Sequence, residues 1–333
     1  MDISSKSAVI IMATYNGEKY IREQIKSLQN QTFSNWELYI SDDNSTDQTV
    51  NILKELQRKD SRIKKIITNE SLYHGAYANY FNVIDYVKNN CKLFDYYFYC
   101  DQDDIWLPEK IEKEVKALSN IEKKYNSNKA AFVYCDLELC DEKCEPLNDM
   151  MKNHIRTQFV DNPYNNFFKE QYVWGTTMAH NTALWDLLFI ESPEKIKNLV
   201  SHDGYISKYA AVYGEITYIQ TPLVLYRRTG NNVSGTPGKY NVISQKLLKI
   251  PTIINNAAQV YWDTLYFAYH VPQKTEVTEE IKECFNNRRA QKKFFTKYNI
   301  LQNERKLGKL STKVVLSTGL YKQSSIFKHE RYD

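Results

Sequence analysis

A short apolar segment that ends in three carboxylates constrains this chain more than any other feature. Residues 98–106 read FYCDQDDIW, and the aromatic run before the acids has the length and composition of a buried β-strand. Asp101, Asp103 and Asp104 crowd the end of that strand, and a cation would relieve their mutual repulsion. Such oxygen ligands suit Mg2+ or Mn2+, and Mg2+ is often held by one or two carboxylates together with substrate phosphates. The segment therefore predicts a divalent-metal and diphosphate site; the alternative is an acidic turn that caps the helix after Pro108.

The surrounding segments alternate between strands and helices. Apolar runs followed by polar turns and helical periodicity predict strands over 9–14, 36–40, 63–67, 95–100 and 130–139, and helices over 18–30, 49–58, 76–89 and 108–120. This alternation is typical of a doubly wound α/β sheet, in which ligands bind beyond the carboxyl ends of the strands. We therefore expect the polar clusters at 14–18, 42–47 and 101–104 to face one cleft.

The last third of the chain has a different pattern. A strand predicted over 221–228 is followed by residues 230–238, which are rich in glycine and asparagine and read as a linker. The remainder is mainly helical in its periodicity. We therefore expect a catalytic domain over 1–236 and a helical, basic region over 237–333.

Charge is distributed unevenly along the chain. From Arg288 onward, 12 Lys and Arg residues stand against 3 Asp and Glu, although the whole chain has a formal net charge of only +4. This asymmetry indicates an anionic partner such as a membrane surface or a lipid diphosphate; a solvated helix face is the alternative. No nucleic-acid-binding motif accompanies the charge, so we expect no nucleic-acid partner. The same helices offer a surface for a homodimer.

Several classes of protein are excluded by what the sequence lacks. No apolar run approaches the roughly 18 residues of a membrane span, and the first residues have no signal-peptide pattern. We therefore expect a cytoplasmic protein, peripheral at the inner face of the membrane where it binds one. No GxGxxG follows the first strand and no GxxxxGK[ST] occurs, which argues against a dinucleotide oxidoreductase and a P-loop ATPase. A nucleotidyltransferase would usually carry a glycine-rich phosphate loop near its N-terminus, and this chain has none.

Several motifs in the same order resemble the inverting family-2 glycosyltransferases of GT-A fold. The resemblance rests on residues 9–19 (VIIMATYNGEK), 39–47 (YISDDNSTD), 98–110 (FYCDQDDIWLPEK), 173–184 and 202–235. The DQDDIW form and the later PLVLYR and GNNVSG segments are most similar to bacterial rhamnosyltransferases that build cell-wall and O-antigen polysaccharides. The resemblance implies a dTDP- or UDP-linked donor, with L-rhamnose from dTDP as the first expectation, and a glycan or lipid-linked glycan acceptor.

The resemblance also implies roles for individual residues. Those that would hold the nucleotide-sugar are Thr14, Tyr15, Glu18, Asp42, Asp43, His74, Gly75, Asn79, Asp101, Gln102, Arg227 and Arg228. The divalent metal, Mn2+ or Mg2+, would be bound by Asp103 and Asp101. The acceptor would lie against Trp174, Gly175, Thr176, His202 and Asp104.

Asp203 matches the general base of the family. Inversion is a single displacement: the acceptor hydroxyl attacks the anomeric carbon opposite the departing nucleoside diphosphate, and a carboxylate takes the hydroxyl proton. In isolation Asp203 would be read as the cap of the following helix. Its position after the other motifs favours the catalytic role.

One departure from the family keeps other interpretations open. Relatives commonly have a histidine where this chain has Thr229, and threonine cannot supply a nitrogen ligand to a metal or phosphate. Either the metal is held more weakly, or Arg228 compensates. The alternatives are an enzyme of the same fold that uses a UDP-hexose or UDP-N-acetylhexosamine, and a catalytically silent glycan-binding protein.

Overall fold

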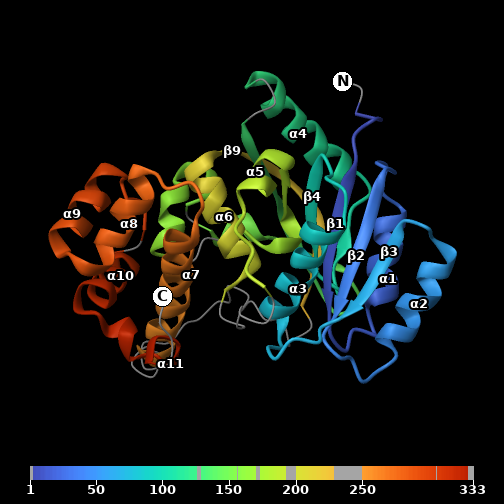
Figure 1. Cartoon of the computed structure of the whole chain (residues 1–333), viewed down its shortest axis with the longest axis horizontal. Coiled ribbons are helices and arrows are strands. Elements are labelled where there is room, and N and C mark those ends of the chain that lie inside the picture. Colours follow the sequence, from blue (N-terminus) through green and yellow to red (C-terminus); the bar gives the residue numbers. More distant parts are fainter. Residues whose placement is uncertain are drawn as a thin grey trace.

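The computed structural model describes residues 3–125, 129–155, 157–169, 173–192, 200–228, 250–304 and 306–328. Its centre is a nine-stranded mixed sheet with the order β3-β2-β1-β4-β8-β6-β9-β5, to which β7 is added by pairing with β6 (Figure 1). The strands are β1 (Ala8–Thr14), β2 (Trp36–Asp42), β3 (Ile63–Thr68), β4 (Tyr96–Cys100), β5 (Ile105–Trp106), β6 (Ala130–Cys140), β7 (Pro146–Met150), β8 (Met178–Asn181) and β9 (Gly214–Arg227).

The N-terminal half of the sheet is parallel. β1 pairs in parallel with both β2 and β4, and β2 pairs in parallel with β3. β8 is antiparallel to its neighbours β4 and β6, which makes the whole sheet mixed. The prediction of a doubly wound α/β sheet is therefore confirmed. Because β1, β2 and β4 run in one direction, their carboxyl ends meet at one edge.

Helices cover both faces of the sheet. These helices are α1 (Ile21–Gln29), α2 (Thr49–Lys59), α3 (Ala76–Asn90), α4 (Lys110–Lys124), α5 (Thr182–Leu187) and α6 (His202–Tyr213). Side chains alternate along β1, so that Val9 and Ile11 join one hydrophobic core and Ile10 joins the other. The first core includes residues of α3, α5 and α6, and the second includes residues of α1, α2 and α4. Burial on both faces explains why these strands are apolar runs rather than alternating ones.

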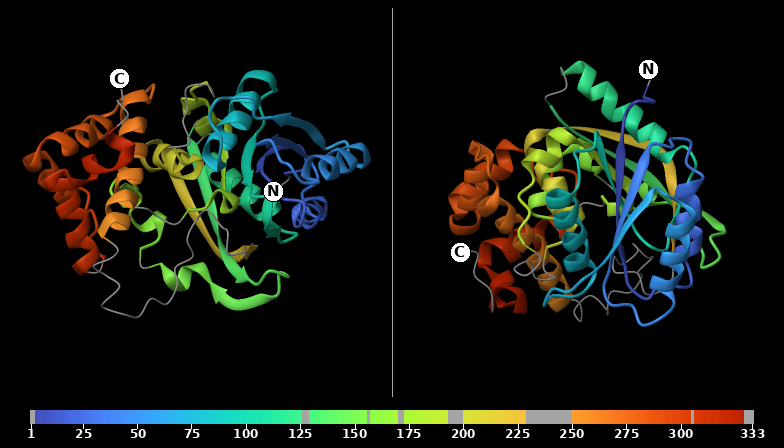
Figure 2. Two further views of the ribbon diagram at one scale, coloured as in Figure 1. Left: turned by 90° about the horizontal axis from the view of Figure 1, so that it is seen from below. Right: turned by 45° about the vertical axis from the view of Figure 1, so that its right-hand side comes forward.

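The C-terminal region is helical, as expected. Its helices are α7 (Ile250–His270), α8 (Glu276–Asn286), α9 (Arg288–Lys297), α10 (Lys306–Thr318) and α11 (Ser325–Lys328). They gather on the side of the sheet away from β1–β3, against α6 (Figures 1 and 2). The Phe267 ring of α7 lies 4.9 Å, edge-on, from the Tyr209 ring of α6, so the helices share a core with the sheet.

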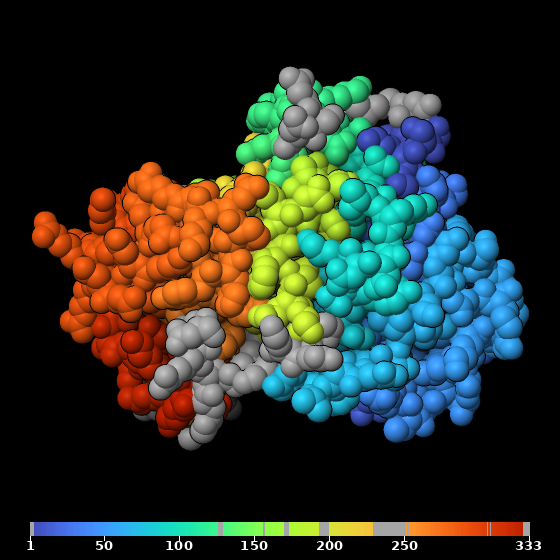
Figure 3. Space-filling view, viewed as in Figure 1, coloured from blue at the N-terminus to red at the C-terminus, as the bar shows by residue number. Residues whose placement is uncertain are grey.

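The predicted boundary at residue 236 falls within 229–249, outside the described residues. In space-filling form, residues around α5 and α6 lie between the C-terminal helices and the N-terminal half of the chain (Figure 3). Across the described parts of the chain, every helix is too short or too polar to cross a membrane.

Candidate active site

A cavity of about 470 Å³ lies at the carboxyl ends of β1 and β4. The predicted polar clusters contribute Thr14, Tyr15, Asp43 and the segment 101–103 to its lining. The remaining walls come from the start of α3, from the segment 173–175, from the first turns of α6, and from one face of α7. The expectation that the three strand-end clusters face one cleft is therefore confirmed.

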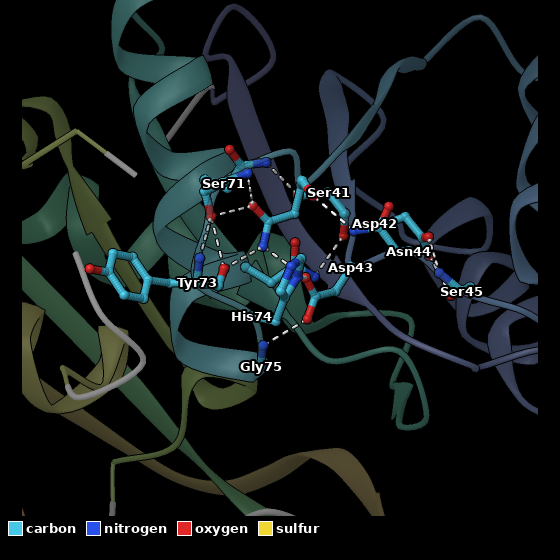
Figure 4. Close-up of polar contacts among 12 residues, drawn as sticks. Ser41, Asp42, Asp43, Asn44, Ser45, Ser71, Tyr73, His74 and Gly75 are labelled. Carbon is cyan, nitrogen blue, oxygen red and sulfur yellow. Dashed lines mark hydrogen bonds and ion pairs between the residues drawn. The ribbon is translucent and has the colours of Figure 1, made fainter. Parts of the chain in front are cut away.

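Asp43 connects the end of β2 to the start of α3. One of its carboxylate oxygens accepts a hydrogen bond from Asn69 (2.7 Å) and lies 2.8 Å from Nδ1 of His74, while the other accepts from the backbone N–H of Gly75 at 2.7 Å (Figure 4). Gly75 has a φ of 102°, a conformation that side-chain-bearing residues rarely adopt. The sequence therefore shapes this loop around a carboxylate that faces the cavity.

Asp42 and Glu18 do not line the cavity. Asp42 is buried and accepts hydrogen bonds from the Thr14 hydroxyl (2.8 Å) and from the backbone N–H of Ser45 (2.8 Å), which hold the turn after β2. Glu18 accepts from the backbone N–H of Gln48 at 2.8 Å, just before α2. In this structure the two carboxylates shape the loops next to the cavity, and their predicted contacts with the nucleotide stay a prediction.

Two side chains of α3 tie the strand ends together. Nδ2 of Asn79 donates to the carbonyl oxygens of Thr14 and Ser41 at 3.0 Å each. The Tyr80 hydroxyl donates to the Asp101 carboxylate at 2.7 Å. Both residues line the cavity, as does Gln102, whose side-chain oxygen accepts from the backbone N–H of Tyr15 at 2.9 Å. Tyr80 was not anticipated from the sequence.

Asp101 and Asp103 form an electrostatically strained pair at the base of the cavity. Burial, followed by the charges of Asp103 and Asp203, raises the pKa of Asp101 to about 7, and the Tyr80 hydrogen bond only partly opposes this. Burial also raises the pKa of Asp103. The described residues include no cluster of three or more potential metal ligands. A pair of carboxylates nevertheless fits Mg2+ or Mn2+, because a nucleotide diphosphate and water supply the other ligands of such ions.

Asp104 and Arg227 lie beneath the pair rather than in the cavity. Asp104 is fully buried, and burial raises its pKa well above the usual range. The buried Arg227 guanidinium donates to the Asp103 carbonyl oxygen at 2.8 Å, pairs with Glu23 and packs over the Tyr20 ring. In this structure the two residues contact each other and the backbone of Asp103, and the predicted acceptor contact of Asp104 and diphosphate contact of Arg227 stay predictions.

Two further predictions concern Arg228 and Thr229, which follow β9. Arg228 is exposed at the end of β9 and does not line the cavity. Thr229 lies outside the described residues, so the consequence of its replacing a histidine stays a prediction.

The predicted acceptor side is built from the segment 174–177 and α6. Trp174, Gly175 and His202 line the cavity, whereas Thr176 is buried and accepts a hydrogen bond from Nε1 of Trp106 at 3.0 Å. Thr176 therefore packs behind the cavity wall, and its predicted contact with the acceptor stays a prediction.

His202 is fixed by packing. Its ring stacks on Tyr80 with 3.5 Å between centroids, and a Cβ added at Gly175 would come within 2.2 Å of its Nε2. Burial lowers the pKa of His202 to about 4, with Asp203 opposing the shift, so the ring is neutral at physiological pH.

Asp203 lies in the first turn of α6 and lines the same cavity as Asp101 and Asp103. One of its carboxylate oxygens accepts from the backbone N–H of Gly204 at 2.7 Å. Its charge contributes to the raised pKa of Asp101. A carboxylate in this position can accept a proton from a group that enters the cavity.

Comparison with known proteins identifies the family. The model of Glycosyl transferase family 2 matches residues 9–136. The dTDP-rhamnosyl transferase RfbG of Shigella flexneri is 31% identical over 228 residues, which cover 67% of this chain and 73% of that protein. This chain is a family-2 glycosyltransferase. Another relative of the glycosyltransferase is UDP-Glc:alpha-D-GlcNAc-diphosphoundecaprenol beta-1,3-glucosyltransferase WfgD of Escherichia coli, 35% identical over 39% of this chain and 45% of that protein.

The fold comparison agrees with the sequence comparison. The crystal structure of S. aureus TarS residues 1–349 in complex with UDP-GlcNAc superimposes with a TM-score of 0.53 and 17% sequence identity. The alignment covers 95% of the glycosyltransferase and 81% of that chain. The expected GT-A fold is thereby confirmed.

The glycosyltransferase has one cavity wall that our sequence analysis did not identify. Asn256, Gln259, Val260 and Asp263 of α7 line the cavity, and they belong to the helical, basic region in which we predicted no site residue. A signal was present, because polar residues at 256, 259 and 263 fall on one face of an otherwise largely apolar helix. Ser201, which precedes α6, and Lys208 of α6 also line the cavity and were missed as well.

Proposed function

We propose that this glycosyltransferase is a metal-dependent, inverting enzyme that moves L-rhamnose from dTDP-rhamnose onto a lipid-linked or polysaccharide acceptor of a bacterial surface glycan. The observation that carries the proposal is the presence of Asp203 in one cavity with the Asp101–Asp103 pair and the strand-end residues Thr14 and Asp43. The dTDP-rhamnose donor is supported by the named activity of the Shigella relative.

In the proposed reaction, the acceptor hydroxyl oxygen bonds to the anomeric carbon while the bond from that carbon to the diphosphate breaks. The hydroxyl proton passes to the Asp203 carboxylate. Asp101 and Asp103 would hold Mn2+ or Mg2+, which neutralises the charge that grows on the leaving diphosphate. Asp43 and Thr14 would contact the nucleoside, and Tyr80 orients Asp101 through its hydrogen bond of 2.7 Å.

Thermal unfolding tests the donor site directly. A ligand that binds only the native state must stabilise it, by about 2.7 kcal/mol at a hundredfold excess over its Kd. We therefore expect Mn2+ with dTDP to raise the Tm of the wild type more than either one alone. Asp103→Ala should lose the metal-dependent part of the shift, whereas Asp186→Ala, which changes an exposed carboxylate of α5, should keep all of it.

The same measurement separates the alternatives. A larger shift with UDP than with dTDP would favour the UDP-hexose or UDP-N-acetylhexosamine enzyme, a donor class that the E. coli relative is named for using. No shift with either nucleotide would contradict the proposed function and favour a silent glycan-binding protein.

We also propose that the enzyme works in the cytoplasm, at the inner face of the membrane. The E. coli relative is named for an acceptor on diphosphoundecaprenol, which is a membrane lipid carrier. On α10, Leu310 is 59% exposed and Val314 is 41% exposed, and the exposed Lys306 and Lys313 lie on the same helix face. Apolar side chains bordered by cations suit the surface of an anionic bilayer.

Vesicle binding tests this surface. Each Lys near an anionic bilayer contributes about 1 kcal/mol, so the double variant Lys306→Glu/Lys313→Glu should bind phosphatidylglycerol vesicles at least about tenfold more weakly in a sedimentation assay. The control Lys64→Glu/Lys65→Glu reverses two exposed charges on β3, on the far side of the molecule, and should bind like the wild type. Equal binding by both double variants would contradict the proposed membrane surface.

A further inference from the structure

The face of α7 that lines the cavity has polar side chains that the chemistry described so far does not use. Asn256, Gln259 and Asp263 lie three, four and seven positions apart, which places them on one face of the helix. The rest of the helix is fixed in the apolar core by buried residues that include Ala258, Tyr261, Leu265 and Phe267. Burial in that core needs no polar face, so the amides and the carboxylate at the cavity need another explanation.

Asp263 ties this face to the catalytic turn of α6. Although it lines the cavity, its side chain is only 3% exposed. Its carboxylate accepts hydrogen bonds from the Ser201 hydroxyl and from Nε2 of Gln259, both at 3.0 Å. A Cβ added at Gly204 would lie 3.1 Å from Oδ2 of Asp263. The polar face of α7 is therefore in direct contact with the turn that carries Asp203.

The position of Asp203 indicates where the α7 face lies relative to the reacting groups. Asp203 lines one cavity with Asp101 and Asp103, and the neighbouring residue Gly204 lies against Asp263 of α7. In a single displacement the acceptor approaches the anomeric carbon from the side opposite the diphosphate. If Asp203 takes the proton of the acceptor hydroxyl, the sugar that carries this hydroxyl lies beside the α7 face that Gly204 contacts.

We propose that Asn256, Gln259 and Asp263 of α7 form the acceptor subsite and bind the hydroxyl groups of an uncharged terminal sugar. This inference rests on the proposed function. Side-chain amides both donate and accept hydrogen bonds and a carboxylate accepts them, which matches the neighbouring hydroxyls of a sugar ring. On this side of the cavity the carboxylates of Asp203 and Asp263 outnumber the one ammonium of the described lining, Lys208. The excess negative charge disfavours a sugar acid, because like charges repel strongly in a partly buried site.

The chain offers a matched control for this proposal. Asn255 and Asn256 are adjacent, exposed asparagines of α7, and only Asn256 lines the cavity. We would compare the wild type with Asn256→Ala, Gln259→Ala and Asn255→Ala, using dTDP-rhamnose or UDP-glucose as donor. The acceptor probes are octyl glycosides of glucose, rhamnose, N-acetylglucosamine and glucuronic acid. Methyl glycosides form a second series, because only an enzyme for lipid-linked acceptors should gain from the alkyl chain.

We expect Asn256→Ala and Gln259→Ala to raise the acceptor KM about tenfold, as the loss of a hydrogen bond to a ligand would. The donor KM and the Tm shift with Mn2+ and dTDP should not change, and Asn255→Ala should match the wild type in every respect. Glucuronide should be the poorest acceptor. An unchanged acceptor KM in both cavity variants, or a donor KM that rises by the same factor, would overturn the subsite.

A binding measurement keeps the test separate from the proposed function. If the wild type transfers no sugar from either donor, the proposed function fails, and saturation-transfer NMR with the same octyl glycosides tests α7 alone. A signal that Gln259→Ala loses and Asn255→Ala keeps would support the subsite even then. Equal signals in the two variants, or no signal with the wild type, would reject it.

Discussion

Replacing Asp203 with Asn should lower the rate of sugar transfer about 10³-fold while leaving nucleotide affinity within about twofold of the wild type. Asparagine has nearly the same shape and can still accept the hydrogen bond from the Gly204 N–H that Asp203 accepts at 2.7 Å. It cannot take up the proton of the acceptor hydroxyl, and a positioned general base contributes about 10² to 10⁴ in rate. Single-turnover transfer and the Tm shift with Mn2+ and dTDP would measure the two effects separately.

Other candidate bases near the cavity are less suitable. His202 is a weak base, because burial lowers its pKa to about 4 and its ring is stacked on Tyr80. Asp104 is fully buried beneath the loop and does not reach the cavity. As a control, Asp186→Asn removes an exposed carboxylate of α5 and should transfer sugar at the wild-type rate. If Asp203→Asn kept more than a tenth of the wild-type rate, the proton would have to go to another group.

The parts of this structure that follow from local sequence were predicted well. The turns after β1, β2 and β4 converge because parallel strands bring their carboxyl ends to one edge, and the apolar runs fix which segments are strands. What local sequence cannot tell is which carboxylate of an acidic loop faces the cavity. Asp103 lines it and Asp104 is buried beneath it, and the difference depends on β9, whose Arg227 N–H donates to Asp104 at 3.3 Å.

The α7 wall was missed for a related reason. The sequence shows that polar residues lie on one face of the helix. Only tertiary packing decides whether that face contacts solvent or a cavity. The contact between α7 and α6 brings residues about sixty positions apart together, as in the hydrogen bond of 3.0 Å from Ser201 to Asp263. The ion pair of Arg227 with Glu23 could not be foreseen from local sequence either, because guanidinium suits phosphate and carboxylate alike.

Asp101→Asn should make the metal-free protein more stable at about pH 8 and should also reduce transfer about 10²-fold or more. Burial and the charges of Asp103 and Asp203 raise the pKa of Asp101 from 3.8 to about 7, so the folded state resists ionisation of this group. The protonated Asp101 contributes fully to the stability of the folded protein below about pH 4, the pKa of an Asp in the unfolded chain. This contribution is lost as the pH rises from about 4 to about 7.

The size of this effect follows from the pKa shift and the exposure of the group. One pKa unit corresponds to about 1.4 kcal/mol, and since part of the carboxylate faces the cavity and its solvent, we expect a gain of about 1 to 3 kcal/mol. Asparagine keeps the acceptor for the Tyr80 hydroxyl, which lies 2.7 Å from Asp101, so the gain is not offset by an unpaired tyrosine. Thermal unfolding in EDTA should therefore show a higher Tm for the variant at about pH 8 and no difference at about pH 4.

Metal should reverse the order of stability. A bound divalent cation compensates the repulsion that Asp101 causes, so Mn2+ with dTDP should stabilise the wild type more than the variant. Binding and catalytic sites often lower the stability of the ligand-free protein in this way, because their charged groups are arranged for the ligand. If the Tm of the variant and that of the wild type in EDTA differed by the same amount at every pH, ionisation of Asp101 would not destabilise the folded protein. In that case the strained carboxylate pair would no longer support a metal site at this strand end.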